Sequence, residues 1–195
     1  MNLFKKLFNS PKEKVTEETS SELQNLPLDQ IFVKNFIENN GKFLYCNTLQ
    51  EVILNLNNIF QENSWETISC NDNDLLKLIK SLSIKTDNKL SNQFPTFLSC
   101  EHLIAENGSI LFSSNQLKEH KISELSEHFI VYATTSQLVR SKGESLTGIK
   151  TRYQGNIPSN ISAIKNYNLN SKDDDFMNYG NTNSKNLYLL LFEDL

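Results

Sequence analysis

Apolar residues recur along the chain at two spacings, one helical and one extended, which alternate from segment to segment. Residues 28–37 carry apolar side chains at helical spacing, and the run KFLYC at 42–46 has the length and composition of a strand. Thr48, followed three residues later by Glu51, is a capping-box pattern at the start of the next apolar helix. The first part of the chain therefore predicts helix, strand and helix in that order.

The same alternation continues to the end of the chain. Further strands are predicted at 65–70, 109–112, 128–133 and 186–192. Helices are predicted around 75–82, across 138–153 and after Pro158, and the polar segment 85–94 predicts a loop. Strands and helices that alternate in this way favour an α/β fold with three layers, a mostly parallel sheet and helices on both faces. A chain of 195 residues fits one such domain, predicted at 27–195.

The first 26 residues have the composition of a flexible N-terminal tail. Residues 12–22 are charged, rich in Ser and Thr, and lack aromatic side chains, so they have little apolar surface with which to offset the entropy of ordering. Within residues 3–8, apolar side chains share one helical face opposite Lys5 and Lys6. This amphipathic patch suits a membrane surface or a partner groove, or it folds back onto the domain.

Charge and composition exclude several classes of function. The net charge is −4 and the longest basic cluster is Lys5-Lys6, so nucleic acid is not an expected partner. We expect no integral membrane segment, because no apolar run approaches the ~18 residues that a span requires. The short, charged N-terminus does not fit a signal peptide, and three widely spaced cysteines suit a reducing compartment. We therefore expect a cytoplasmic protein.

Three segments, in order, resemble the LUD domain of lactate-utilisation C proteins. They are a turn and strand at 105–112 (AENGSILF), the stretch at 127–131 (EHFIV), and the loop at 155–164 (GNIPSNISAI), in which Asn160 replaces the arginine of the family. The resemblance implies a LUD-like α/β domain similar in fold to sugar-phosphate isomerases and CoA-transferases. It also implies a bacterial protein of L-lactate oxidation, with an iron–sulfur subunit as partner and a small anionic metabolite as ligand.

Glu106 is the candidate catalytic residue. It is predicted at a turn between two strands, and the triplet Glu-Asn-Gly resembles the turn that carries the nucleophilic glutamate of CoA-transferases, whose carboxylate attacks an acyl-CoA thioester. The alternative is a turn carboxylate that accepts hydrogen bonds from nearby N–H groups. The resemblance favours an accessory or small-anion-binding protein. An acyl-CoA-handling transferase that uses Glu106, or a structural adaptor, is the alternative.

Six further residues are candidate ligand-binding positions. Pro158 and its two successors are predicted at a helix start, where free N–H groups either bind an anion or are simply capped. His128 opens an apolar strand and either contacts a ligand or makes a structural hydrogen bond. The six residues are Asn107, Gly108, His128, Pro158, Ser159 and Asn160.

The cysteines are the remaining candidates for chemistry. Cys46, Cys70 and Cys100 each follow an apolar run, so they are expected near one edge of the sheet, where they either gather around a metal or fill small buried spaces. The chain has no C-x-x-C pair and no His with a partner at metal-ligand spacing. We therefore predict neither a metal site nor a cofactor.

Overall fold

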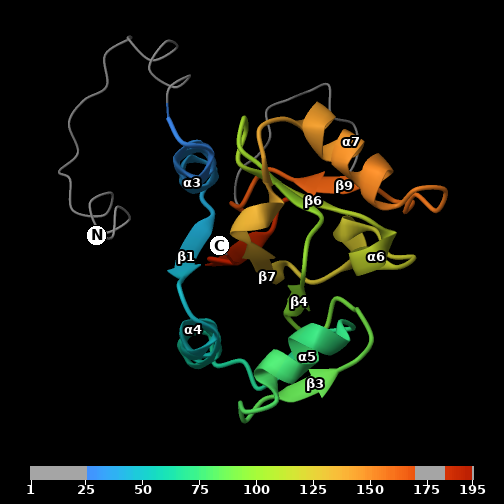
Figure 1. Cartoon of the computed structure of the whole chain (residues 1–195). Coiled ribbons are helices and arrows are strands. Elements are labelled where there is room, and N and C mark those ends of the chain that lie inside the picture. The colour runs from blue at the N-terminus through green and yellow to red at the C-terminus, as the bar shows by residue number, and fades with distance from the viewer. Residues whose placement is uncertain (1–25, 170–182, 195) are drawn as a thin grey trace.

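The computed structural model describes residues 26–169 and 183–194, and its centre is a parallel sheet of six strands (Figure 1). Every pairing in this sheet is parallel, so all six strands end at the same edge. In sheet order the strands are β1 (Lys42–Cys46), β10 (Asn186–Phe192), β7 (His128–Thr134), β4 (Thr96–Leu98), β2 (Thr67–Ser69) and β3 (Lys85–Asp87). The prediction of an α/β fold with a mainly parallel sheet is confirmed.

Three α-helices pack on the two faces of this sheet. They are α3 (Leu28–Glu38), α4 (Leu49–Glu62) and α5 (Asn73–Ile79). Side-chain caps begin two of them: Thr48 accepts from Glu51 N–H in α4, and Asp72 accepts from two N–H groups in α5. Helices α4 and α5 lie on one side of the sheet and α3 on the other (Figure 1).

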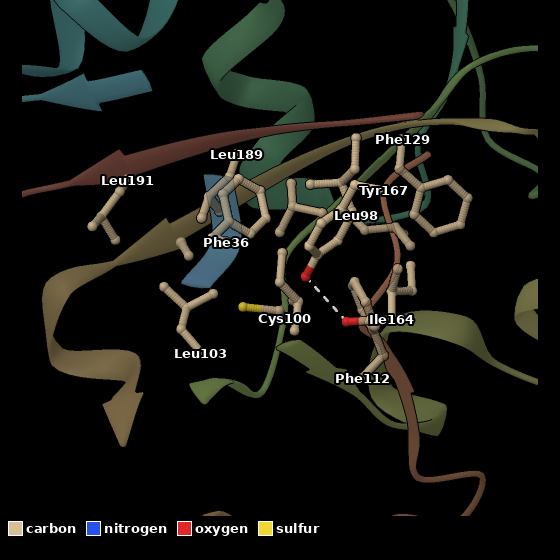
Figure 2. Close-up of a cluster of buried hydrophobic side chains, with 14 of the residues drawn as sticks. Phe36, Leu98, Cys100, Leu103, Phe112, Phe129, Ile164, Tyr167, Leu189 and Leu191 are labelled. Carbon is tan, nitrogen blue, oxygen red and sulfur yellow. Dashed lines mark hydrogen bonds between the residues drawn. The ribbon is translucent and has the colours of Figure 1, made fainter. Parts of the chain in front are cut away.

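Alternation along the strands sends neighbouring side chains into two separate cores. In β7, Phe129 and Val131 belong to the core that contains α3, whereas Ile130 belongs to the core that contains α4 and α5. The long strand β10 alternates in the same way. Figure 2 shows the first core, in which Phe36 of α3 lies beside strand residues, and Tyr167 donates from its hydroxyl to the carbonyl of Ile164 at 3.1 Å. Because both faces are covered, these strands are apolar throughout.

A second sheet of four strands covers the α3 side of the molecule, and the sequence did not predict it. Its strands, in order, are β8 (Leu138–Val139), β5 (His102–Ile104), β6 (Ser109–Phe112) and β9 (Ser162–Ile164). Strands β5 and β6 contribute Leu103, Ile110 and Phe112 to the shared core with the large sheet. The opposite face of the second sheet carries α7 (Lys142–Arg152), through a small cluster that includes Ile149.

Short helical turns join these units. They are α6 (Ser114–Leu117), η2 (Ile122–Glu124) and η3 (Thr135–Gln137). Thr134 and Gln137 form a capping box at the start of η3, a single turn that strand β8 follows, so the helix predicted across 138–153 begins only at Lys142.

The structure corrects two other predictions. No helix begins at Pro158: residues 162–164 form strand β9, and Asn160 has a φ of 51°, outside the helical region. The polar segment 85–94 contains the short edge strand β3. The predicted tail at 1–26 and the amphipathic patch at 3–8 lie outside the described residues, apart from Leu26. In the described part of the chain, no helix has the length and apolarity needed to cross a membrane.

Candidate functional site

The chain leaves adjacent strands β2 and β4 in opposite directions, which creates a crevice at the carboxyl edge of the sheet. From β2 it passes through α5 to β3, and from β4 it crosses to the second sheet and returns to β7. Ligands of open parallel sheets usually bind at such a switch point. A cavity of about 220 Å³ lies there, lined by Asn71, Asp72, Asn73, Leu98, Ser99, Asn115, Gln116 and Lys118. We call it the carboxyl-edge cavity.

The cavity wall is polar and is tied together by hydrogen bonds. Asp72 caps α5 with one carboxylate oxygen and accepts from the Ser99 hydroxyl with the other, at 3.0 Å. Asn71 donates from its side-chain amide to the Gln116 carbonyl at 3.3 Å, which joins the loop after β2 to α6. These bonds hold the polar groups of two chain segments around one small space.

Lys118 brings a positive charge to this cavity from a backbone conformation that is uncommon for its type. Its φ is 54° and its ψ is −127°, whereas most residues other than glycine avoid positive φ. The ammonium group donates to the Asn115 carbonyl at 2.7 Å and is otherwise exposed. Backbone strain of this kind is concentrated at functional sites.

Glu101 is buried behind the cavity wall with a carboxylate that has several donors. Its side chain is 1% exposed. Oxygen Oε1 accepts from the Ser113 hydroxyl at 2.6 Å, from the Asn115 amide at 2.9 Å and from the Gln116 amide at 3.2 Å. Asn115 and Gln116 also line the cavity, so Glu101 is bonded to its wall.

The other oxygen of Glu101 faces the end of α7. Oε2 accepts from the Tyr153 hydroxyl at 3.2 Å and lies 3.8 Å from the guanidinium of Arg152, which is half exposed. Burial by itself raises the pKa of Glu101, but the hydrogen bonds from Ser113, Asn115, Gln116 and Tyr153 outweigh it and lower the pKa below the usual 4.5. The carboxylate is therefore charged at neutral pH.

Sequence reasoning did not select Glu101, although a signal was present. Residues 96–105 are mostly apolar, and Glu101 is the one acidic residue among them. Its side chain is buried in the structure. A carboxylate inside a buried run requires polar partners, and that requirement marks the position.

The structure places Glu106 in the turn between β5 and β6, as predicted. Its carboxylate is exposed and accepts from the backbone N–H of Lys142 at 3.0 Å, at the start of α7. Negative charge at a helix start is favourable because of the unpaired N–H groups there. This geometry matches the alternative of a turn carboxylate that accepts from nearby N–H groups.

The two residues after Glu106 attach the turn to α3. Asn107 accepts from the N–H and hydroxyl of Ser109, and its carbonyl accepts from the Asn39 amide at 2.8 Å. Gly108 has a φ of 67°, and a Cβ there would lie 2.5 Å from the backbone of Asn35. This close approach explains the glycine.

The predicted loop at 158–160 packs on α6 and lies at the opposite end of β6 from Glu106. Ser159 exchanges two hydrogen bonds with Ser114, and Asn160 donates from its amide to the His120 carbonyl at 2.7 Å. Pro158 is buried. The loop therefore supports α6, which carries two residues of the cavity wall.

His128 lies at the amino edge of the sheet, far along β7 from the carboxyl-edge cavity. Its ring packs against Trp65 in a tilted arrangement with centroids 5.3 Å apart, and its Nδ1 lies 3.1 Å from the Asn186 amide. Burial lowers its pKa below the usual 6.5. It lines a larger cavity of about 780 Å³, which also contains Glu66, Glu124 and Glu127 and, among its described lining residues, no Lys or Arg. An anion is not favoured there.

The three cysteines are buried near the carboxyl edge but do not gather. Cys46 ends β1 and Cys70 follows β2, with three strands between them, while Cys100 belongs to the core on the other face. Burial raises the pKa of each thiol. Among the residues that the structure describes, no three His, Cys, Asp or Glu side chains are grouped to hold a metal.

A comparison with solved structures identifies a protein of the same architecture. A DUF162 family protein from Deinococcus radiodurans superposes with a TM-score of 0.58 at 10% sequence identity, over 86% of this chain and 99% of that one. The two proteins share a fold. No family model and no curated protein matches the sequence. At this identity the likeness concerns the fold alone.

Proposed function

We propose that this chain is a LUD-type accessory protein that binds a small anionic metabolite in the carboxyl-edge cavity. The observation that carries the proposal is the position of the cavity between the ends of β2 and β4, where the chain leaves in opposite directions. DUF162 is the LUD domain family, so the shared fold agrees with the resemblance of the three sequence segments.

The chemistry of the cavity suits a small polar acid. Lys118 supplies a positive charge, and the surrounding amide and hydroxyl groups supply donors and acceptors. A volume of about 220 Å³ is below the ~300 Å³ at which sites for drug-sized ligands begin, so a ligand of a few carbon atoms fits best. The resemblance connects this ligand to bacterial L-lactate oxidation in the cytoplasm, with an iron–sulfur subunit as the partner.

The test is a titration of the full chain with L-lactate, followed by NMR of backbone and side-chain amides. Propane-1,2-diol is the matched control ligand, because it replaces the carboxylate of lactate with a neutral group. We expect saturable shifts at 71–73, 99 and 115–118 with L-lactate only, and a weaker effect in Lys118→Gln. Shifts confined to other residues, or equal shifts with the diol, would contradict the proposal.

A further inference from the structure

Glu101 is a buried and extensively hydrogen-bonded charge behind the wall of the carboxyl-edge cavity. Its carboxylate accepts from three side chains of the segment 113–116, and two of these, Asn115 and Gln116, also line the cavity. Within the four-residue helix α6, the Gln116 oxygen accepts from the Ser113 N–H at 2.9 Å in a capping box, and the Asn115 amide donates to Glu101 at 2.9 Å. Glu101 therefore receives an N–H from both amide groups, while the capping bond also holds the oxygen of Gln116.

We infer that Glu101 is a positioning residue, which holds the amide groups of Asn115 and Gln116 in the geometry that binds the ligand. The inference rests on the proposed function for the identity of the ligand. A carboxylate has only acceptors, so its Oε1 can receive all three donors at once. Each amide then has a fixed orientation: the Gln116 oxygen accepts from the Ser113 N–H, and one hydrogen of each amide is not directed at Oε1.

The carboxylate cannot turn away from the wall, because its second oxygen is held from the opposite side. Tyr153 donates to Oε2 at 3.2 Å, and the Gln137 amide donates to the backbone carbonyls of Cys100 and Glu101. These contacts come from η3, which contains Gln137, and from Tyr153 at the end of α7. Both elements are separate from α6. Glu101 thus fixes the wall to the rigid second sheet, as binding groups require for preorganisation.

Glu101→Gln tests the inference, because it keeps the shape but replaces one acceptor oxygen with an NH₂ donor. If the NH₂ faces the three wall donors, they lose their acceptor; if the remaining oxygen faces them, they share a neutral and weaker acceptor in place of the carboxylate. The first readout is the side-chain amide NMR signals of Asn115 and Gln116 in the unliganded full chain. We expect both to move toward solvent-exposed positions, while the amide of Asn63, which donates to the Ile59 carbonyl, stays unchanged.

The second readout is the affinity for L-lactate, which we expect to fall roughly tenfold or more in Glu101→Gln. Arg152→Gln is the control, since Arg152 approaches only Oε2, at 3.8 Å; its affinity should change less than twofold. Equal losses in both variants, or unmoved amide signals, would overturn the inference. If L-lactate does not bind the natural protein, the proposed function fails while the amide signals still decide the role of Glu101.

A second pair of variants covers the case in which Glu101→Gln does not fold. Ser113→Ala removes a hydroxyl that donates to Oε1 and that also caps α6 by accepting from the Asn115 N–H, and Tyr153→Phe removes a hydroxyl that donates to Oε2. We expect the amide signals of Asn115 and Gln116 to shift in Ser113→Ala and to stay in place in Tyr153→Phe. The reverse pattern would refute the positioning role.

Discussion

The two ends of strand β5 each carry a glutamate, and the structure uses them differently. Glu101, just before β5, is buried, and its carboxylate is surrounded by side-chain donors. Glu106, in the turn after β5, is exposed and accepts one backbone N–H at the start of α7. After Glu106, the backbone of Asn107 and Gly108 makes the close contacts with α3 and its C-terminal end.

This contrast shows that one short strand is anchored in two ways. Side chains converge on a buried charge at one end, beside the carboxyl-edge cavity, whereas close backbone packing fixes the other end against α3. Substitutions at the two ends should therefore change the free energy of unfolding by different amounts and with a different dependence on pH. The predictions below test the difference, from the largest expected effect to the smallest.

Gly108→Ala should be the most damaging of these substitutions. The added Cβ would lie 2.5 Å from the Asn35 carbonyl carbon and the Phe36 nitrogen, which are backbone atoms of α3, and the residue would also keep a positive φ. We expect a loss of about 3 kcal/mol in the free energy of unfolding, measured with urea.

Gly155→Ala is the matched control for Gly108→Ala. Gly155 also has a positive φ, of 80°, but no heavy atom lies within 4 Å of an added Cβ. The free energy of unfolding of Gly155→Ala should fall by only about 1 kcal/mol, because only the positive φ of the backbone is unfavourable for alanine there. Similar losses at both glycines would mean that contact with α3 is not what fixes the turn.

Glu101→Gln should lower the free energy of unfolding by about 2 kcal/mol at neutral pH, because buried donors lose their charged acceptor. The pKa of Glu101 is lowered in the folded protein, so its stabilisation is fully present above its unfolded pKa, near 4.5, and is lost as the pH falls through the lower folded pKa. The stability gap between the natural protein and the variant should therefore narrow below pH 4.5.

Urea unfolding at a series of pH values measures this gap. Tyr153→Phe is the comparison variant, since it removes one donor and keeps the carboxylate. It should cost less than Glu101→Gln, and its stability should still fall in acid with that of the natural protein. A gap for Glu101→Gln that is constant from pH 3 to 7 would show that the carboxylate contributes no charge-dependent stability.

The sequence predicted the parts of this fold that depend on local pattern. Strands β1, β6, β7 and β10 were predicted within a residue at each end, because strands buried on both faces are continuous apolar runs. Strand β3 was missed, since KTD is polar and lies at the edge of the sheet. Strand β9 was taken for a helix because Pro158-Ser159 imitates a helix start, whereas pairing with β6 decides its conformation.

The candidate site could be predicted less well, because it is built from distant segments. The lining of the carboxyl-edge cavity comes from 71–73, 98–99 and 115–118, and their proximity depends on a strand order that no local pattern specifies. Of the residues selected from the sequence, Ser159 comes nearest to this wall, through its bonds to Ser114. The segment 105–108 was correctly predicted as a turn. Ligand binding by Asn107 and Gly108 in this turn stays a prediction.

Glu106→Gln should have the smallest effect on stability. The Lys142 N–H needs an acceptor, and the amide oxygen of glutamine supplies one at the same position. Only the interaction of the negative charge with the start of α7 is lost, which is worth about 0.5 kcal/mol at an exposed site. Urea unfolding should therefore barely distinguish the variant from the natural protein.

The same variant decides between metabolite binding and the acyl-CoA transferase alternative. A nucleophilic Glu106 would attack an acyl-CoA thioester to form a mixed anhydride with release of CoA thiolate. The thiolate would then attack the glutamyl carbonyl and release the acyl group as a carboxylate, which leaves a glutamyl-CoA thioester. Incubation with a panel of acyl-CoA compounds, trapping with hydroxylamine or borohydride, and peptide mass spectrometry would detect either species on that side chain. We expect no modification, because the carboxylate is already engaged at the start of α7 and lines neither cavity described above. An adduct on Glu106 that is absent from Glu106→Gln would instead identify the turn after β5 as the reactive end of the strand. The principal site would then be this turn and not the carboxyl-edge cavity.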